Sequence, residues 1–169
     1  MSVPRIHEYN VAVNWTGAAS GPTSSYAAYS REYEIVIPGK PTLIGSADPA
    51  FRGDAAHHNP EELLVAALST CHMLSYLALC ALEKLSVTKY ADNAAGMMTE
   101  EGGSGRFVSV SLTPVVTIDD DRLELAMELH HRAHETCFIA NSVNFMITMQ
   151  PTVSNGKETH TSGTVAARP

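Results

Sequence analysis

The sequence has few cysteines: its 169 residues include only Cys71, Cys80 and Cys137. A small, odd number of cysteines excludes the dense disulfide framework of small secreted domains, so we expect reduced thiols in a cytoplasmic protein. Basic residues are also scarce, since 11 Lys and Arg stand against 18 Asp and Glu, for a net charge of −7. This balance argues against binding to nucleic acid or to anionic membranes, which favour basic faces.

The sequence shows no internal repeat and no interdomain linker, and residues 1–10 lack the apolar core of a secretion signal. Its length suits one domain. We therefore expect a single domain over residues 1–156. Residues 157–169 have little apolar surface to bury and are expected to form a frayed tail.

A long stretch without any charged side chain, residues 63–82, lies within a predicted helix over residues 59–85. Asn59 is suited to cap the first backbone N–H groups, and Pro60 fits the first helical position. Glu61 and the glutamate after it place negative charge at the positive end of the helix dipole. A helix that is apolar all round must be buried on every side.

Two environments suit this apolar helix. Roughly twenty uncharged residues could span a bilayer, but the flanks lack the basic bias and aromatic belts of a membrane anchor. We therefore favour the core helix of a soluble protein. About 26 residues extend roughly 39 Å, which is longer than the core of a small domain. The helix is thus expected to pack against a second copy in a homodimer, with sheet covering each helix.

Alternating apolar residues predict strands on both sides of the helix, and in the first of them Val11, Val13 and Trp15 predict one buried face. The expected strands are residues 5–16, 26–37, 41–45, 86–101, 106–118 and 144–150. A second helix is expected to be capped by the aspartates at 119–121 and to reach about residue 140. This order predicts an α+β fold with a mostly antiparallel sheet.

The three cysteines are not equivalent. Cys80 lies nine positions after Cys71, so on a straight helix the two face opposite sides about 13 Å apart. A disulfide needs Cα atoms within roughly 7 Å, which excludes a bond between them. If the chain contains a redox pair, it is Cys71 with Cys137. By composition alone, a buried cysteine usually serves as a small hydrophobic residue of the core, and we expect Cys80 to fill the core in this way.

Two motifs place the other cysteines in a wider context. NPEELLVAALSTC at residues 59–71 is followed by AHETCFIAN at residues 133–141. Together they resemble the OsmC/Ohr family of osmotically inducible and organic hydroperoxide resistance proteins, over most of the chain. The resemblance implies an OsmC-like fold, in which mostly antiparallel sheets pack around the long central helices of an intertwined homodimer. Phe138 stands where many members have proline, which indicates a divergent OsmC-like subgroup.

The resemblance also implies an activity. It is thiol-dependent reduction of organic hydroperoxides to alcohols, with hydrogen peroxide a poorer substrate, an external dithiol as reductant, and no cofactor or metal. By position, Cys71 is similar to the peroxidatic cysteine and Cys137 to the resolving cysteine. Glu61 matches the glutamate of the family's NPE turn. Arg52 is the best match for the catalytic arginine, and Arg31 is the alternative.

The chemistry explains why charged groups are needed. Only a thiolate attacks a peroxide, and burial in an apolar helix raises the pKa of a cysteine. Cys71 lies too far from the helix N-terminus for the dipole to help, so a guanidinium, always charged, is expected to stabilise the thiolate and the leaving alkoxide. Glu61 would hold that arginine. Because Glu61 lies about 15 Å before Cys71 on a straight helix, either the long Arg52 side chain bridges them or Glu61 serves a site across the dimer interface.

Other interpretations of these residues compete with this one. His130, His134 and Cys137 share a helix face with a spacing that suits zinc. His72 points about 100° away from Cys71, so a hydrogen-bonded core histidine is favoured over a general base. The alternative function is a non-catalytic OsmC-like protein that binds small hydrophobic ligands or senses oxidants.

Overall fold

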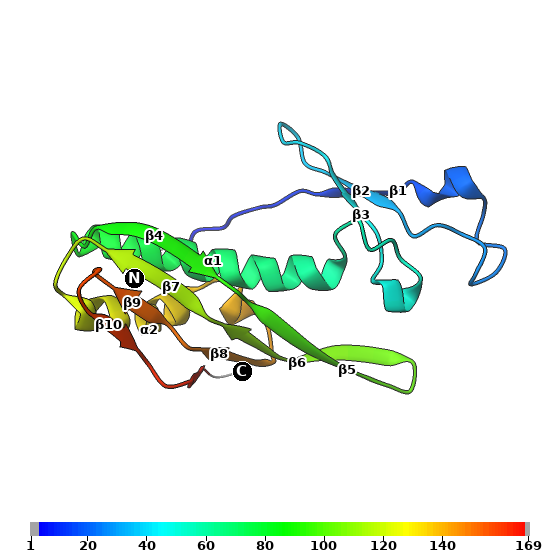
Figure 1. The fold of residues 1–169 in the computed structure, drawn as a ribbon. Coiled ribbons are helices and arrows are strands. Elements are labelled where there is room, and N and C mark those ends of the chain that lie inside the picture. Colours follow the sequence, from blue (N-terminus) through cyan, green and yellow to red (C-terminus); the bar gives the residue numbers. More distant parts are fainter. Residues whose placement is uncertain (1–3, 168–169) are drawn as a thin grey trace. The chain divides into compact units, whose positions relative to one another are not determined.

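The computed structural model describes residues 4–167 and divides into two compact units, Met1–Leu63 and Leu64–Pro169 (Figure 1). The boundary falls in the first turns of helix α1 (Pro60–Leu82). Residues 1–156, predicted to form one domain, contribute to both units. We call them unit 1 and unit 2.

Unit 1 is built on a three-stranded antiparallel sheet in the order β1-β2-β3. Its elements are β1 (Ala12–Trp15), the 3₁₀ helix η1 (Gly17–Ser20), β2 (Tyr33–Val36), β3 (Leu43–Gly45) and the 3₁₀ helix η2 (Pro49–Phe51). β1 and β2 are much shorter than predicted, and β3 lies within its predicted range of residues 41–45. All four residues of β1 are exposed, so the prediction of one buried face is wrong for the single chain. β1 is the edge strand of its sheet. Alternating apolar residues indicate a strand with one apolar face, but they do not show whether another element covers that face.

Unit 2 contains two four-stranded sheets, in the orders β10-β9-β7-β4 and β11-β8-β6-β5. The strands are β4 (Val87–Asp92), β5 (Ala95–Glu101), β6 (Ser104–Leu112), β7 (Pro114–Ile118), β8 (Met146–Met149), β9 (Thr152–Ser154), β10 (Thr159–Thr161) and β11 (Val165–Ala167). Among the pairings of these eight strands, those of β6 with β8 and of β7 with β9 are parallel and the others are antiparallel. The predicted α+β fold with mostly antiparallel sheets is therefore confirmed.

Two predicted strands are each divided in two, because the chain passes from one sheet to the other in their middle. The segment predicted as 86–101 forms β4 and β5, and the segment predicted as 106–118 forms β6 and β7. At the crossing, the Thr113 N–H donates to a carboxylate oxygen of Asp92 at 2.7 Å, and the Thr113 hydroxyl donates to the Asn93 carbonyl at 2.8 Å. These bonds fix both bends at one place.

The N-terminus of α1 is capped as predicted. The Asn59 side chain accepts a hydrogen bond from the Glu62 N–H at 2.8 Å, and the Glu62 carboxylate accepts one from the Asn59 N–H at 3.3 Å. This reciprocal arrangement is a capping box, which satisfies two of the free donors of a helix start.

Burial of α1 is confined to one stripe. Four residues spaced one turn apart are buried: Leu68, His72, Tyr76 and Cys80. Leu74 and Leu82 are 62% and 78% exposed, so the expected burial on every side does not occur within one chain. Among the described residues, α1 is also long and apolar enough to cross a membrane.

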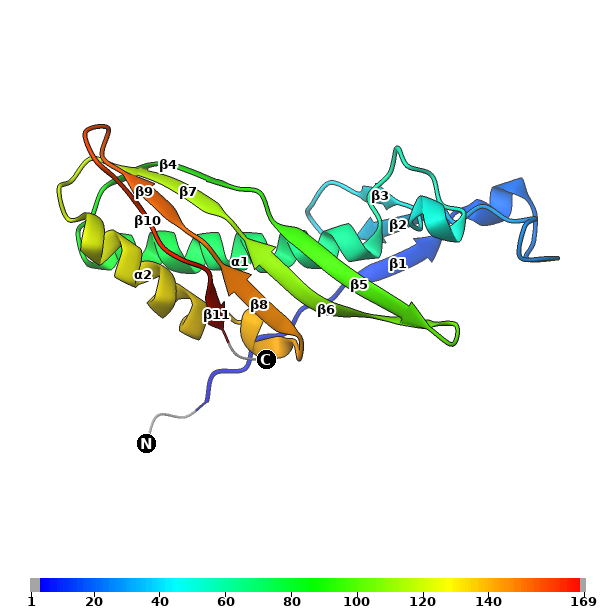
Figure 2. The ribbon, with the colours of Figure 1, turned by 60° about the horizontal axis from the view of Figure 1, so that its bottom comes forward.

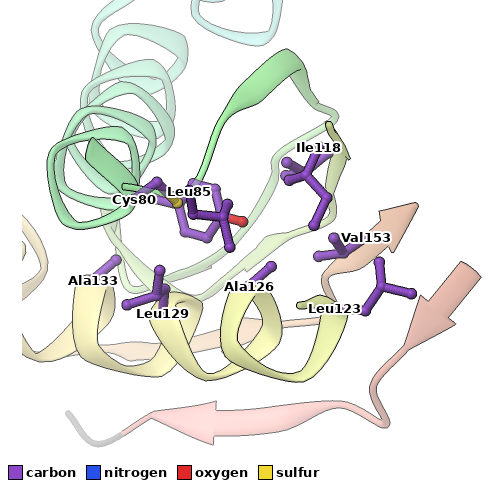
Figure 3. Close-up of a cluster of buried hydrophobic side chains, with 10 residues drawn as sticks. Cys80, Leu85, Ile118, Leu123, Ala126, Leu129, Ala133 and Val153 are labelled. Carbon is purple, nitrogen blue, oxygen red and sulfur yellow. The ribbon is translucent and has the colours of Figure 1, made fainter. Parts of the chain in front are cut away.

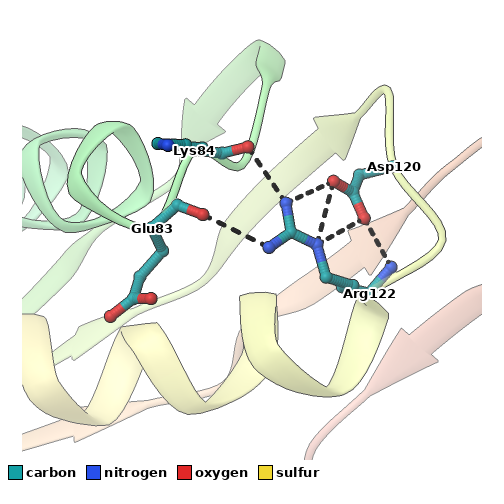
Figure 4. A network of polar contacts seen from close by, with 4 residues as sticks. All are labelled: Glu83, Lys84, Asp120 and Arg122. Carbon is teal, nitrogen blue, oxygen red and sulfur yellow. Dashed lines mark hydrogen bonds and ion pairs between the residues drawn. The ribbon is translucent and has the colours of Figure 1, made fainter.

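Helix α2 (Leu123–Thr136) begins later and ends earlier than predicted. The aspartates before it were expected to cap it, but no side chain caps its start. Asp120 instead binds Arg122, whose guanidinium donates to the carbonyls of Glu83 and Lys84 at the end of α1 (Figure 4). The hydrogen bonds from Arg122 lower the pKa of Asp120 to about 2. Asp120 therefore orients Arg122, which satisfies two backbone carbonyls at the C-terminal end of α1.

α1 and α2 lie next to each other on one face of the strands of unit 2 (Figures 1 and 2). Small residues on α2, Ala126 and Ala133, are completely buried and allow a close approach (Figure 3). The buried residues of this core are Tyr76, Cys80, Leu85, Val116, Ile118, Leu123, Ala126, Leu129, Ala133 and Val153. A second cluster, around Leu68 and the strands β6 and β8, consists of Leu68, Val110, Leu112, Ile147 and Met149.

The C-terminal segment corrects a prediction. Residues 157–169 were expected to fray, but β10 pairs with β9 and β11 pairs with β8. Strand pairing satisfies the backbone without requiring apolar side chains, so a polar segment can be ordered at a sheet edge. Residues 168–169 of the predicted tail lie outside the described residues.

Candidate active site

Two helices bring together the thiols of Cys71 and Cys137, which lie 66 positions apart in the sequence. Cys71 lies in the middle of α1 and is half-buried. Cys137 follows α2 directly, is 1% exposed and has an extended backbone. Its N–H donates to the His134 carbonyl at 3.2 Å, and its carbonyl accepts from the Asn141 N–H at 3.0 Å. Both sides of Cys137 are thereby anchored.

The Cys137 thiol is a close neighbour of Cys71, and both cysteines are free. Burial, with the neighbouring Cys71 thiol, raises the pKa of Cys137 to about 11. Cys137 is therefore a thiol at neutral pH. It is suited to keep its proton while the other sulfur reacts, and then to attack at short range.

Exposed apolar side chains lie beside both cysteines in the sequence. Leu74, one turn after Cys71, is 62% exposed, and Phe138, directly after Cys137, is 76% exposed. Each cysteine is therefore followed in the sequence by an apolar side chain that reaches the surface.

The two candidate arginines differ in their surroundings within unit 1. Arg52 ends the 3₁₀ helix η2 with a left-handed backbone (φ 66°), and its side chain is exposed. Arg31 is half-buried, and its guanidinium lies over the rings of Tyr29 and Tyr26, at 3.8 and 4.8 Å from their centroids. It also donates hydrogen bonds to the carbonyls of both tyrosines. Arg31 is thus held in one orientation.

Arg31 also lines a cavity of about 300 Å³ in unit 1, and Arg52 does not. The lining residues are Trp15, Thr23, Tyr29, Arg31, Tyr33, Ala47 and Pro60. Aromatic rings with one cation on the wall suit an apolar ligand that carries a polar or negative group. The geometry of unit 1 therefore favours the alternative arginine, Arg31.

Glu61, directly after the cavity residue Pro60, has an unusual carboxylate. Its Oε2 is buried and has no hydrogen-bond partner among the described residues. A buried carboxylate oxygen without a hydrogen-bond partner destabilises the folded state, so we expect a hydrogen-bond donor or a cation to bind this group. Nearby, burial raises the pKa of Tyr33, and the charges of Glu61 and Glu62 raise it further. Negative charge thus gathers at the start of α1.

One group of metal-type ligand atoms occurs in the part of the chain that the structure describes. Atoms of Glu32, Asp54 and His57 all lie within 4.8 Å of one another, with His57 Nδ1 3.3 Å from Asp54 Oδ2. A carboxylate–carboxylate–imidazole set suits a divalent cation, and the contact between His57 and Asp54 also accounts for their closeness without a metal. All three residues belong to unit 1.

The predicted zinc ligands on α2 have other partners. His130 Nδ1 lies 3.1 Å from His72 Nε2, and the Cys137 thiol neighbours that of Cys71. No cluster of three ligand atoms includes His130, His134 or Cys137 among residues 4–167. The geometry therefore favours the thiol pair over zinc at this place.

The buried histidine pair is the feature that sequence reasoning missed. His72 was predicted to be a hydrogen-bonded core histidine, and it is 1% exposed, but its partner His130 was not foreseen. Burial, with the charges of neighbouring histidines, lowers the pKa of His72 to about 4 and that of His130 to about 2. The spacing of four from His72 to Tyr76 marks the buried face of α1, but no local signal in the sequence identifies His130 as the partner.

The fold and the site together define a class: α+β proteins in which two helices bring two thiols into contact. The model of the OsmC-like protein family matches residues 53–152, and the chain belongs to this family, as predicted. Among curated proteins, none matches the chain.

Solved structures are similar over most of the chain. An OsmC-like protein of unknown function from Vibrio cholerae is 31% identical over 88% of this chain and 100% of its own, with a TM-score of 0.75. An organic hydroperoxide resistance protein from Elizabethkingia anophelis is 21% identical, over 89% and 99% of the two chains, with a TM-score of 0.62. Another, from Legionella pneumophila, is 18% identical, over 88% and 99%, with a TM-score of 0.60. The last two likenesses show the fold.

Proposed function

We propose that the protein is a cysteine-based peroxidase that reduces organic hydroperoxides to alcohols, and hydrogen peroxide less efficiently. The observation that carries the proposal is the contact between Cys71 and the protonated thiol of Cys137. Two similar folds belong to proteins named for organic hydroperoxide resistance, which supports the same chemistry.

In the first step the Cys71 thiolate attacks the peroxide oxygen distal to the alkyl group. The O–O bond breaks, the alkoxide leaves and takes a proton to become an alcohol, and Cys71 becomes a sulfenic acid. In the second step the sulfur of Cys137 attacks the Cys71 sulfur. The hydroxyl group leaves with the proton of Cys137 as water, and a disulfide forms. An external dithiol then reduces the disulfide and is itself oxidised.

Charged groups must support the first step. We propose that an arginine and Glu61 take this part, as the resemblance implies, and that the arginine is Arg31 rather than Arg52. Arg31 is the stacked guanidinium on the cavity wall, whereas Arg52 is exposed. The contacts of Arg31 with Tyr26 and Tyr29 already fix its orientation, so it needs little rearrangement when negative charge develops on the leaving oxygen.

We further propose that the protein acts as a homodimer. The sides of α1 outside its buried stripe expose large apolar residues, such as Leu74 and Leu82, that a single chain leaves in water. A second α1 laid against them would bury this surface and supply the cover that an all-apolar helix requires. The homodimer is expected in the cytoplasm, without nucleic-acid, membrane or metal partners.

One observation favours a second candidate, a protein that binds small hydrophobic ligands without turnover. The aromatic cavity of unit 1 is large enough, at about 300 Å³, for a small molecule. The two candidates differ in a simple assay. A peroxidase consumes many equivalents of cumene hydroperoxide when dithiothreitol is present, whereas a binder consumes none.

That assay needs the Cys71→Ser variant beside the wild-type protein. Peroxide consumption is expected to fall to the uncatalysed rate in Cys71→Ser and to continue in Cys80→Ala, because Cys80 lies in the apolar core, away from the reacting pair. Turnover that survives the loss of Cys71 would rule out the proposed mechanism.

A further inference from the structure

His72 and His130 form a buried hydrogen bond that links α1 to α2. The distance from His72 Nε2 to His130 Nδ1 is 3.1 Å, and the two residues are 1% and 0% exposed. Their pKa values, lowered by burial to about 4 and about 2, keep both rings neutral at physiological pH. Two neutral imidazoles share one proton in such a contact, so one ring donates and the other accepts.

This hydrogen bond lies close to the thiol pair on the same two helices. His72 directly follows Cys71 on α1. His130 lies on α2 seven residues before Cys137, which follows the end of that helix directly, so the two are separated by roughly 10 Å or less along the helix axis. The imidazole contact and the thiol contact are therefore two neighbouring ties between α1 and α2.

The other contacts around these two rings set the position of α1 along α2 less strictly than the hydrogen bond does. Tyr76 stacks on His130 with ring centroids 3.9 Å apart, and the two imidazoles are themselves nearly parallel, at 12°. Dispersion contacts of stacked rings and small alanines depend less on direction than a hydrogen bond does. The hydrogen bond is directional, and it is the one polar contact of each ring, because His72 Nδ1 and His130 Nε2 have no partner among the described residues.

We propose that the His72–His130 hydrogen bond is a positioning contact that sets α1 against α2 so that the sulfurs of Cys71 and Cys137 stay within bonding reach. His72 and His130 touch neither substrate nor reacting sulfur in this account; they act through the two cysteines. The inference rests on the proposed function for its peroxide step, while its effect on disulfide closure is independent of the oxidant.

The ease with which the Cys71–Cys137 disulfide forms measures how well the two sulfurs are positioned. When oxidised dithiothreitol is the oxidant, two thiols of the protein lose their hydrogens, the protein disulfide forms and the reagent becomes a dithiol. The equilibrium constant of this exchange reports how well the folded protein holds Cys71 and Cys137 together. The loss of one buried hydrogen bond corresponds to a factor of roughly three to ten in such a constant.

Asparagine and glutamine allow a matched test, because the asparagine amide nitrogen occupies a place like Nδ1 and the glutamine amide nitrogen a place like Nε2. His130 uses Nδ1, so His130→Asn should keep the bond and His130→Gln should lose it. His72 uses Nε2, so the order reverses: His72→Gln should keep the bond and His72→Asn should lose it. Residue size alone cannot produce this reversal.

The readouts are the equilibrium with dithiothreitol and, by stopped flow, the rate of disulfide closure after cumene hydroperoxide has oxidised Cys71. We expect His130→Gln and His72→Asn to lower both by roughly three- to tenfold relative to their matched variants, with the rate of the first oxidation unchanged. Arg132→Gln is the control, because Arg132 makes an exposed ion pair with Glu83 at 3.1 Å, beyond the end of α1. It should leave closure unchanged.

Equal closure in the members of each matched pair would overturn the positioning proposal, and so would an order that follows residue size at both sites. If one variant fails to fold, the pair at the other histidine decides, since each pair carries the prediction alone. A protein that ignores hydroperoxide but shows the reversed order with dithiothreitol would refute the proposed peroxidase and leave the positioning contact standing.

Discussion

The carboxylate of Asp92 accepts a hydrogen bond from the Ser69 hydroxyl at 2.6 Å, and its other oxygen accepts one from the Thr113 N–H at 2.7 Å. Ser69 lies on α1 two residues before Cys71, and Thr113 is the bend between β6 and β7. A single carboxylate therefore ties the thiol-bearing helix to the point where the chain changes sheets. Asp92 is an anchor that sequence patterns alone did not reveal.

Asp92→Ala should destabilise the fold more than Ser69→Ala does. Removal of the carboxylate leaves two donors unpaired, with an expected loss of about 2–3 kcal/mol, whereas removal of the hydroxyl ends one bond and should cost about 1 kcal/mol. Urea unfolding of the wild-type protein and both variants measures the difference. Equal stability of the two variants would show that Asp92 does not anchor both elements.

Stability should depend on pH through the histidine pair. In the unfolded chain both histidines titrate near pH 6.5, while burial, with the charges of His134, His131 and of the pair itself, lowers the folded pKa values to about 4 and about 2. Between about pH 6.5 and pH 4 the unfolded state binds more protons, so stability falls as the pH falls. Each histidine contributes up to about 1.4 kcal/mol per pH unit in this window and nothing above about pH 7.

Urea unfolding at several pH values tests this dependence. The double variant His72→Gln/His130→Asn lacks both titrating groups and should lose the corresponding slope. The comparison cancels the contributions of carboxylates and of His134, whose pKa burial also lowers. Parallel pH profiles for the wild-type protein and the double variant would contradict neutral burial of the pair.

The two arginines should differ in their effect on peroxide reduction. Arg31→Gln removes the stacked guanidinium of the cavity wall and should lower the rate of Cys71 oxidation by about a hundredfold, a common loss when a charge-stabilising donor is removed. Arg52→Gln should react at close to the wild-type rate. Stopped-flow kinetics with cumene hydroperoxide measure both. Arg31→Lys, which keeps the charge but not the planar fork, should recover part of the loss. A large loss in Arg52→Gln alone would return the assignment to Arg52.

Local signals explain which parts of the fold were predictable. The cap of α1 follows from Asn59 and Glu62, three residues apart, and β3 follows from a short apolar run between turns. Features that depend on distant partners were missed. The bend at Thr113 needs Asp92, the start of α2 changes because Asp120 binds Arg122, and β10 is ordered by its pairing with β9.

The candidate site was predictable to the same degree. The motifs around Cys71 and Cys137 predicted the pair, and the structure brings these thiols together. Spacing could not rank the arginines, because it does not reveal that Arg31 stacks on Tyr29. Nor could it pair His72 with His130, 58 positions later, since that contact depends on how α1 packs against α2.

The most direct test of the central claim is the intact mass of the protein under non-reducing conditions, before and after one equivalent of cumene hydroperoxide, followed by peptide mapping. The account predicts a loss of about two mass units per chain, the two thiol hydrogens, and a peptide that links Cys71 to Cys137. An unchanged mass with both thiols free would contradict the peroxidase, and a stable sulfenic acid on Cys71 would remove Cys137 from the cycle.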